Sequence, residues 1–352
     1  MKSIVSKFLV SSFFFTALVA GGFWYFGKLD SLSLIFAGIL IVYIAAVLFY
    51  IVVMPMKSVL LQMQLMLAGR KFKKIYTKRV DEIGIMAHFF NQVTSGFTKV
   101  ASDIEDRNRI LDELKMAAEI QKNLVPKDPP QFDDLIFEAK IRPASELGGD
   151  SYNFIDTKDK IYIYLGDVTG HGTTAALIMA MISSIIGIFS GTLASARDII
   201  VATNSALRKY VKSSMYMTLV MLCYDKNAKK MTYVGAGHEH ILIYRKDSGQ
   251  IDDIVSGGTA LGMIDDVSKT ALEKELMLNK GDMIVLYTDG ITEARNSSQE
   301  LYGLERLKQS LFEYGQTYSA TGVAHHISED LAAFVGDESQ LDDITLLVIE
   351  KK

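Results

Sequence analysis

The sequence predicts an α+β domain of the sandwich type, preceded by two transmembrane helices and a helical linker. Three observations lead to this prediction. First, residues 8–26 and 31–54 form two stretches of 19 and 24 residues without a charged side chain. Second, apolar residues at helical spacing follow as far as about residue 125. Third, the residues after about 125 contain both short apolar strand patterns and longer helical patterns. This mixture is typical of helices packed against antiparallel sheets.

Composition and charge exclude several classes of protein. The 352 residues include only 1 cysteine and 5 prolines, which excludes a disulfide scaffold, a cysteine-based zinc site and a proline-rich disordered chain. The formal net charge of -4 is unevenly distributed. Residues 55–124 carry 12 basic and 8 acidic groups, whereas residues 125–352 carry 22 and 32. The basic residues lie beside the predicted membrane segment and the globular end is acidic. This distribution argues against a nucleic-acid partner for the globular end.

Residues 1–54 are predicted to form two membrane spans, since about 20 apolar residues cross a bilayer. A cleaved signal peptide, with Lys2 and Lys7 as its basic start, is the alternative for the first stretch. The aromatic run 23–26, typical of a membrane interface, and the immediate second stretch favour a span. Lysines and arginines flank both outer ends, so the positive-inside rule places the N-terminus and the globular domain in the cytoplasm, on the inner membrane. An external loop of about four residues leaves no room for a sensor domain.

Residues 55–106 are predicted to form a signalling module. Pro55 is expected to mark the end of the second span, and an amphipathic helix then runs to Gly69. A basic connector leads to Asp81-Glu82-x-Gly84 and to a second helix whose apolar residues recur about every 3.5 positions, as in a coiled coil. These last residues are Val93, Phe97, Val100, Ile104, Leu111 and Leu114. The order of elements resembles a HAMP module, which implies a homodimer; a plain amphipathic linker is the alternative.

Residues 107–125 are predicted to form a linker helix that Pro126 ends, so the globular domain occupies residues 126–352. Six strands are predicted at residues 161–165, 217–224, 231–234, 241–244, 283–287 and 344–349. Four helices are predicted at residues 175–189, 196–211, 304–314 and 323–334. No glycine-rich nucleotide-binding fingerprint is present in the sequence.

Aspartates stand beside glycines at the ends of several predicted strands. Asp150 follows Gly148-Gly149, Asp167 opens Asp-Val-Thr-Gly-His-Gly, Asp289 precedes Gly290, and Asp342-Asp343 precede the last strand. Each aspartate alone is an ordinary turn residue. Four sites with one arrangement predict a cluster, because the ends of neighbouring strands converge. Carboxylates in a cluster repel one another unless a cation offsets them, and oxygen ligands without histidine or cysteine favour Mg²⁺ or Mn²⁺.

With these motifs in sequence order, residues 118–350 resemble the metal-dependent PPM serine/threonine phosphatases of protein phosphatase 2C fold. The resemblance is greatest to the bacterial branch that acts in sigma-factor partner switching. It is carried by Glu119-Ile120-Gln121 through Pro126, Gly148-Gly149-Asp150, the segment 166–172, Gly235-Ala236-Gly237-His238, Tyr287-Thr288-Asp289-Gly290 with Glu293, and Asp342-Asp343-Ile344-Thr345. The resemblance implies a β-sandwich flanked by helices, with two Mn²⁺ or Mg²⁺ ions at one edge.

The resemblance also implies roles for these residues. Asp167 would bridge both ions, with one of them also held by the backbone carbonyl of Val168. Asp289 and Asp342 would hold the second ion, with Asp343 as the alternative to Asp342. Asp150 would ligate directly or orient water on the metals. Two ions lower the pKa of a shared water, which attacks phosphorus in line, so no protein nucleophile is needed.

Other candidates depend on fewer observations. His171 is a candidate proton donor to the leaving serine oxygen, and a turn residue is the alternative. Gly170 and Gly172 are candidate substrate-loop residues that serve backbone geometry. His238 is a candidate substrate-binding residue or a loop-shaping one. Glu119, Ile120 and Gln121 are candidate regulatory residues, because the equivalent helix of related phosphatases packs on the catalytic domain.

The resulting functional hypothesis is a membrane-anchored, metal-dependent phosphatase of a phosphoserine or phosphothreonine protein. By resemblance, the substrate is a small anti-sigma-factor antagonist of STAS fold. One alternative is a metal-dependent phosphohydrolase that acts on a small molecule. The other is a catalytically silent dimeric signalling scaffold. The presence of an acidic residue at all four carboxylate positions argues against this second alternative.

Overall fold

The structure, a computed structural model, describes residues 4–26, 31–126 and 130–352. The predicted external loop at 27–30 and Lys2 lie outside the described residues. Contacts divide the chain into two compact units, residues 1–110 and residues 111–352. Each unit is described by itself.

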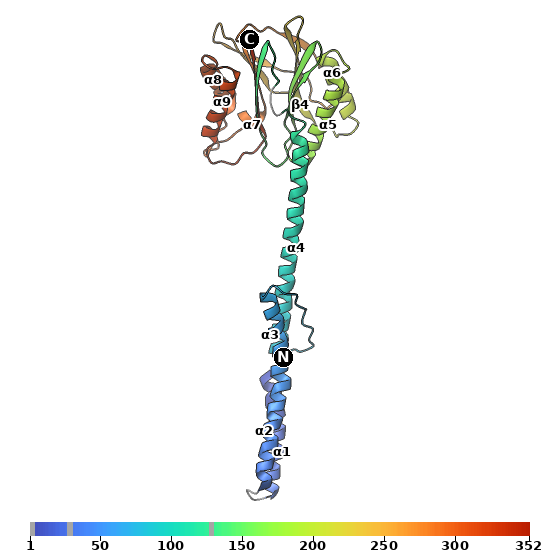
Figure 1. Ribbon diagram of the computed structural model, residues 1–352, viewed down its shortest axis with the longest axis vertical. Helices are drawn as coiled ribbons and strands as arrows, with labels where there is room; N and C mark the ends of the chain where they lie inside the picture. The colour runs from blue at the N-terminus through green and yellow to red at the C-terminus, as the bar shows by residue number, and fades with distance from the viewer. Residues whose placement is uncertain (1–3, 27–30, 127–129) are drawn as a thin grey trace. The chain divides into compact units, whose positions relative to one another are not determined.

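In the first unit, two apolar helices pack against each other. They are α1 (Ile4–Phe26) and α2 (Ser31–Leu48). The hydroxyls of Ser11 and Tyr43 lie 2.8 Å apart, and the ring of Phe15 stacks on Tyr43 at 4.1 Å between centroids. Among the described residues near the N-terminus, 35–67 form one exposed apolar helix long enough to cross a membrane, while 6–22 form a shorter apolar helix. The trace of these helices is blue in Figure 1.

The helix does not end at Pro55, contrary to the sequence-based expectation. It continues from α2 through a π-helical turn, η1 (Phe49–Val53), into α3 (Met54–Leu67), with Pro55 in the first turn of α3. Proline has no N–H to give to the carbonyl four residues earlier, which is that of Ile51. The guanidinium of Arg79 donates to this carbonyl at 2.9 Å. The proline is therefore accommodated by a π-turn and a side-chain donor rather than by a break.

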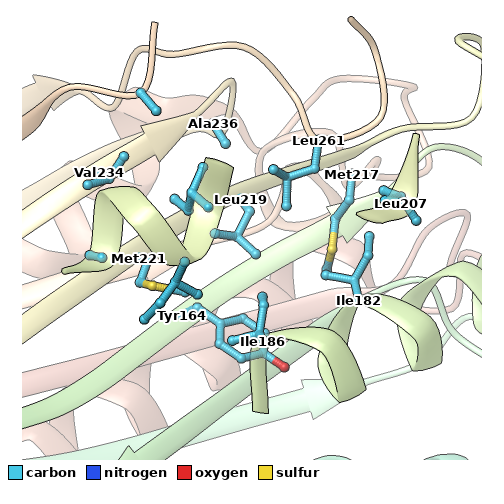
Figure 2. Packing of buried hydrophobic residues seen from close by; sticks show 14 of the residues in the cluster. Tyr164, Ile182, Ile186, Leu207, Met217, Leu219, Met221, Val234, Ala236 and Leu261 are labelled. Carbon is cyan, nitrogen blue, oxygen red and sulfur yellow. The ribbon is translucent and has the colours of Figure 1, made fainter. Parts of the chain in front are cut away.

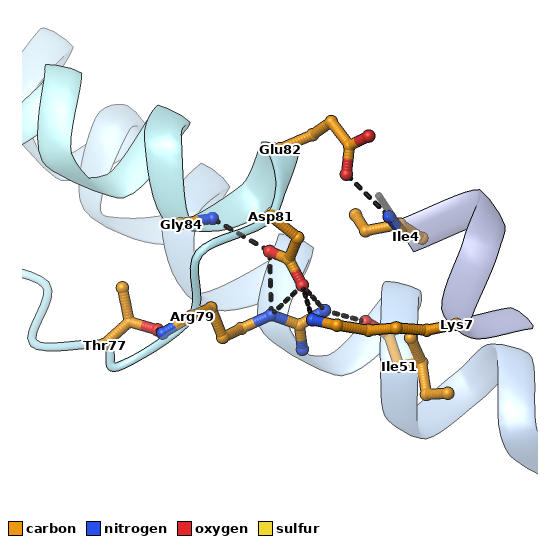
Figure 3. Close-up of polar contacts among 8 residues, drawn as sticks. All are labelled: Ile4, Lys7, Ile51, Thr77, Arg79, Asp81, Glu82 and Gly84. Carbon is orange, nitrogen blue, oxygen red and sulfur yellow. Dashed lines mark hydrogen bonds and ion pairs between the residues drawn. The ribbon is translucent and has the colours of Figure 1, made fainter. Parts of the chain in front are cut away.

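A buried carboxylate joins three segments of this unit (Figure 3). Asp81 is fully buried and accepts hydrogen bonds from Lys7 at 2.5 Å and from Arg79 Nε at 3.0 and 3.1 Å. The backbone N–H of Gly84 donates to the same carboxylate at 3.2 Å. Burial by itself raises the pKa of Asp81, but the hydrogen bonds from Arg79, Lys7 and Gly84 outweigh it and hold the pKa well below its ordinary range. We call Lys7, Arg79 and Asp81 the clasp.

The long helix α4 (Glu82–Lys122) begins directly after the clasp and continues into the second unit. It is a single uninterrupted helix, as the sequence predicted for the stretch up to the linker. Several apolar residues of the predicted coiled-coil seam are exposed in the single chain: Phe97 by 64%, Val100 by 56% and Ile104 by 54%.

The second unit contains two five-stranded antiparallel sheets. The first has the order β1 (Leu135–Arg142), β10 (Ile344–Lys351), β9 (Met283–Tyr287), β6 (His240–Tyr244) and β7 (Ile251–Val255). The second has the order β2 (Ser151–Asp156), β3 (Lys160–Val168), β4 (Met217–Asp225), β5 (Lys230–Ala236) and β8 (Glu273–Leu276). The pairings between these strands are all antiparallel, as the sequence predicted.

Helices cover the outer face of each sheet (Figure 1). The second sheet carries α5 (Thr173–Ser190) and α6 (Ala196–Leu207). The first sheet carries α8 (Gly303–Gly315), α9 (Ala320–Val335) and the short α7 (Asp289–Thr292). The structure thus has the α+β, protein phosphatase 2C-like architecture that the sequence predicted, with all six predicted strands and four predicted helices present.

Side chains that point alternately to the two faces of the strands fill three hydrophobic layers. In β3, Ile161 and Ile163 point between the sheets, while Tyr162 and Tyr164 point toward α5 and α6. Figure 2 shows the layer under α5, where Ile186 lies beside Tyr164 and Ile182 lies beside Met217. A third layer lies under α8 and α9. Apolar helix α5 meets the length and composition of a membrane span, but its burial against the sheet marks it as a core helix.

Candidate active site

The register of each sheet brings the predicted aspartates together in pairs. In the second sheet, Ser151 pairs with Gly166, so Asp150 before β2 and Asp167 near the end of β3 lie at one sheet edge. In the first sheet, Thr288 donates from its N–H to the carbonyl of Thr345 at 3.1 Å. This bond places Asp289, after β9, beside the residues that precede β10.

Asp150 connects the two edges. It is 2% exposed, and its Oδ2 accepts hydrogen bonds from the hydroxyls of Thr288 at 2.8 Å and Thr345 at 2.5 Å. Thr345 lies in β10 and Thr288 directly follows β9, and both are fully buried. Oδ1 of Asp150 is buried too, and no hydrogen-bond partner for it occurs in the described part of the chain. The aspartate therefore presents one satisfied and one unsatisfied oxygen at the junction of the sheets.

The carboxylates repel one another. Burial, the nearby Asp289 and the nearby Asp342 raise the pKa of Asp167 to about 8. Burial and Asp342 raise the pKa of Asp289 to about 6. Burial and the charge of Asp167 raise the pKa of Asp150 well above its ordinary value. These shifts all disfavour the ionised form, because the carboxylates are buried close to one another.

The donor set fits a hard cation. No group of three or more Asp, Glu, His or Cys side chains stands ready-made as a ligand set among the described residues. The oxygen-only chemistry of the cluster and the unpartnered Oδ1 of Asp150 nevertheless suit Mg²⁺ or Mn²⁺. A bound cation would reverse the repulsion that raises these pKa values.

The two neighbouring aspartates before β10 differ in their surroundings. Asp342 is exposed, and its carboxylate accepts from the backbone N–H of Asp343 at 2.8 Å. Asp343 is 4% exposed, and its carboxylate accepts three backbone N–H donors, from Ala144, Gly149 and Asp150. The sequence left open which of the two would ligate a metal, and the structure gives them different contacts.

The loop after β3 has the backbone geometry that its glycines permit. Gly170 and Gly172 both have φ of +82°, a region that L side chains rarely adopt. Open space surrounds the position of a Cβ at either residue, so conformation rather than crowding requires glycine. Val168 is buried, while His171, the candidate proton donor, lies exposed at the turn.

His238 is buried behind the site. Its Nδ1 lies 3.0 Å from the hydroxyl of Thr218, and its backbone carbonyl accepts from Ser256 at 2.5 Å. Burial lowers the pKa of His238 to about 4, so the imidazole is neutral at physiological pH. These contacts hold the His238 side chain in the interior of the domain, where it is 7% exposed.

The end of α4 contacts the turn that carries Asp150. The side-chain amide of Gln121 donates to the carbonyl of Gly148 at 2.6 Å and accepts from the N–H of Gly148 at 3.3 Å. Of the other two predicted regulatory residues, Glu119 is exposed and Ile120 is 68% exposed. The expected apolar packing therefore comes from Leu124, which joins the core under α5, and not from Ile120.

Four residues of this site received no role from the sequence, although three of them, Thr288, Glu293 and Thr345, lie in the motifs quoted for the resemblance. Thr288 and Thr345 lie inside the motifs singled out, but only the fold brings their hydroxyls to Asp150. Glu239 and Glu293 add negative charge near Asp289. The four-residue spacing from Asp289 to Glu293 was a usable signal, whereas Glu239 follows a strand that had no such mark.

The sequence of this chain is similar to a known protein family and to characterised relatives. The family described as Stage II sporulation protein E (SpoIIE) matches residues 157–352. The chain belongs to the SpoIIE family. Phosphoserine phosphatase RsbU of Bacillus subtilis is 28% identical over 284 residues, which cover 80% of this chain and 83% of RsbU. Protein IcfG of Synechocystis is 30% identical over 305 residues, 77% of this chain and 46% of IcfG.

Solved structures have the same fold. The SiaA-PP2C domain of Pseudomonas aeruginosa superposes with a TM-score of 0.60 at 21% identity, over 70% of this chain and 98% of that domain. The RsbU and RsbW domains of Rv1364c from Mycobacterium tuberculosis give 0.53 at 23% identity, over 62% and 60%. The SpoIIE-family chain is accordingly a protein serine/threonine phosphatase of PPM type.

Proposed function

We propose that this SpoIIE-family phosphatase is anchored in a membrane and dephosphorylates a phosphoserine or phosphothreonine protein in partner-switching signalling. One observation carries the proposal: carboxylates from two facing sheets surround Asp150, whose Oδ1 is buried and unpartnered within the described residues. A site that concentrates negative charge in this way suits cation-dependent attack on a phosphate ester.

Two Mn²⁺ or Mg²⁺ ions are the proposed cofactors. Asp167 would be the shared ligand, the Val168 carbonyl would serve one ion, and Asp289 and Asp342 would serve the other. Asp150 would ligate directly or orient water. The chemistry that such ions supply is the activation of water near neutral pH and the neutralisation of charge on the phosphate oxygens.

The chain's own residues position these groups. Thr288 and Thr345 hold one oxygen of Asp150 and leave the other free. Gly170 and Gly172 shape the loop between Asp167 and α5, which is the proposed seat of the substrate phosphate. Neutral His238 supports this side of the site from within, and exposed His171 is the candidate donor of a proton to the leaving serine oxygen.

The proposed substrate is a phosphorylated STAS-type anti-sigma-factor antagonist. Similarity to phosphoserine phosphatase RsbU over most of both chains supports a phosphoserine protein of this class. A small phosphorylated metabolite and a catalytically silent scaffold are the alternatives from the sequence. Membership of the SpoIIE family and the acidic residues at all four predicted positions argue for the protein phosphatase.

The proposed anchor is the N-terminal hairpin, with the globular domain on the cytoplasmic side of the inner membrane. The exposed apolar helix 35–67 supports one span, and the positive flanks of both apolar stretches support the orientation. The exposed apolar seam of α4, with Phe97, Val100 and Ile104, supports a parallel homodimer through a HAMP-like module. The contact between Gln121 and Gly148 supports regulation of the metal site by this helix.

The decisive experiment is phosphate release by the full-length chain in membranes. The substrates are a phosphorylated STAS protein, free phosphoserine and p-nitrophenyl phosphate, each with Mn²⁺, with Mg²⁺ and with a chelator. We expect metal-dependent release that strongly favours the phosphoprotein. Preference for free phosphoserine would support the small-molecule alternative, and no release from any substrate would support the scaffold.

A further inference from the structure

The best-connected polar side chain beside the cluster is Asp343, which the metal proposal does not use. Its Oδ1 accepts from the N–H of Ala144 at 2.7 Å, and its Oδ2 accepts from the N–H groups of Gly149 at 2.5 Å and Asp150 at 3.3 Å. The residue is 4% exposed. A carboxylate whose two oxygens are both occupied by backbone donors, in a buried position, is a structural anion.

Two glycines of the motifs, Gly148 and Gly290, lie in close contact with Asp343. A Cβ added at Gly148 would lie 2.6 Å from Asp343 Oδ2, and one added at Gly290 would lie 1.9 Å from the Asp343 carbonyl oxygen. Neither glycine has a positive φ. Both positions therefore require glycine because Asp343 approaches closely, and not because of backbone conformation. Segments far apart in sequence, at 148, 290 and 343, thus form one packed junction.

The same junction orients Asp150. The hydroxyl of Thr288 accepts from the N–H of Thr345 at 3.0 Å, so its own hydrogen is free to point to Asp150 Oδ2. Thr345 donates a second hydroxyl bond to that oxygen. Asp343 fixes the backbone of Asp150, and the two threonines fix its carboxylate, which leaves Oδ1 as the available oxygen.

We infer that Asp343 is a positioning residue that holds the turn 148–150 in place. The Mn²⁺ measurements in its test rest on the proposed two-metal function. Asp343 acts through Asp150, because its hydrogen bonds to the turn fix the position of the Asp150 Oδ1 before any cation binds. The carboxylate of the neighbouring Asp342, by contrast, is exposed and accepts a hydrogen bond from the backbone N–H of Asp343.

The test compares Asp343→Asn with Asp342→Asn in the full-length chain without metal. Amide hydrogen exchange is followed across residues 144–150, with β4 as the internal measure of an intact fold. An asparagine amide cannot accept from both Ala144 and Gly149, so Asp343→Asn is expected to speed exchange there by about tenfold or more. Asp342→Asn is expected to leave this exchange unchanged.

Mn²⁺ affinity, measured by calorimetry on the same proteins, completes the test. Asp342→Asn is expected to lose affinity by about tenfold or more, as for a lost ligand, and Asp343→Asn to lose less and to regain activity at high Mn²⁺. Gly148→Ala, which pushes a methyl group against Asp343, is a second variant and is expected to reproduce the exchange phenotype. Thr345→Val is expected to weaken Mn²⁺ binding, with recovery in Thr345→Ser.

The outcomes separate the two proposals. Unchanged exchange in both Asp343→Asn and Gly148→Ala, with intact β4, would overturn the positioning role. Loss of Mn²⁺ affinity in Asp343→Asn that exceeds the loss in Asp342→Asn would exchange the two roles. Faster exchange in Asp343→Asn, together with Mn²⁺ binding that neither Asp342→Asn nor Asp167→Asn alters, would support the positioning role and reject the two-metal function.

Discussion

Asp167 stands at the centre of the carboxylate cluster, near the end of β3, and burial raises its pKa to about 8. Replacement by asparagine removes the proposed shared ligand and, in the metal-free protein, also removes a source of repulsion. We predict that Asp167→Asn abolishes phosphate release and raises the unfolding free energy of the metal-free chain by about 1 kcal/mol. Opposite changes in activity and stability are the signature of a functional rather than a structural carboxylate.

The matched control for this variant is Asp156→Asn, at the other end of β2 from Asp150, where the carboxylate pairs with Lys226 at the surface. It should leave turnover unchanged. Asp289→Asn and Asp342→Asn should lower turnover, with partial recovery at high Mn²⁺. Near-normal turnover of Asp167→Asn at saturating Mn²⁺ would remove Asp167 from the metal site.

His238 makes the domain less stable in mild acid. Its pKa in the folded chain is about 4, below the ordinary value near 6.5, because burial disfavours the imidazolium. The unfolded chain therefore takes up a proton as the pH falls from about 7 toward 4, while the folded chain does not. We predict that this residue alone lowers the unfolding free energy by about 2 kcal/mol between pH 8 and pH 5.

The measurement is the difference between the wild-type chain and His238→Gln, which cancels the titration of the carboxylates. Denaturation should be followed by hydrogen exchange in β4 and β5, since the only tryptophan, Trp24, is in the other unit. Identical pH profiles for the two proteins would show that the pKa of His238 is the same in the folded and the unfolded state.

At the scale of elements, the clasp joins the start of α1 to the start of α4. Asp81 is fully buried, so removal of one cationic partner leaves a charge with less compensation. In a double-mutant cycle of Lys7→Met and Asp81→Asn, we predict a coupling free energy of about 1–2 kcal/mol. The readout is hydrogen exchange over residues 81–87 of the full-length chain.

The control cycle uses Arg109 and Asp106, an ion pair on α4 whose side chains are 70% and 60% exposed. An exposed pair of this spacing contributes about 0.3 kcal/mol and should show almost no coupling. A clasp coupling as small as that of the control pair would mean that α1 is not tied to α4 through Asp81.

At the scale of the whole molecule, α4 is the only covalent route from the first unit to the second. Gln121, in its last turn, contacts Gly148 beside Asp150. We predict that rotation of this end changes the activity. Two residues inserted before Ala117 rotate the following helix by roughly 200°, whereas seven return it to within about 20° of its starting phase.

The measurement is Mn²⁺-dependent phosphate release in membranes. The two-residue insertion should change activity by about tenfold, and the seven-residue insertion should restore most of it. Gln121→Ala should remove the difference between the two insertions. Equal activity of both insertions in the native background would make α4 a passive tether.

The sequence by itself determined the α+β class, six strands and four helices in their order, and the candidate residues of the cluster. These features depend on local patterns: alternation in β3 and β4, helical spacing in α5 and α8, and aspartate beside glycine at strand ends. Weakly patterned elements were missed, namely β1, β7 and β8, of which β7 and β8 are short edge strands that expose much of their length. Pro55 was misjudged because a donor 24 positions later, Arg79, satisfies the carbonyl that it leaves.

Only the tertiary structure decided how the cluster is built. Asp342 and Asp343 are chemically identical neighbours, and a sequence cannot tell which one meets the backbone N–H groups of Ala144 and Gly149 almost 200 positions away. Gly148 has a negative φ, and its lack of a Cβ makes room for Asp343. Residue types state which chemistry is available, while hydrogen bonds between distant segments set which oxygen remains free, because those contacts form only when the two sheets pack.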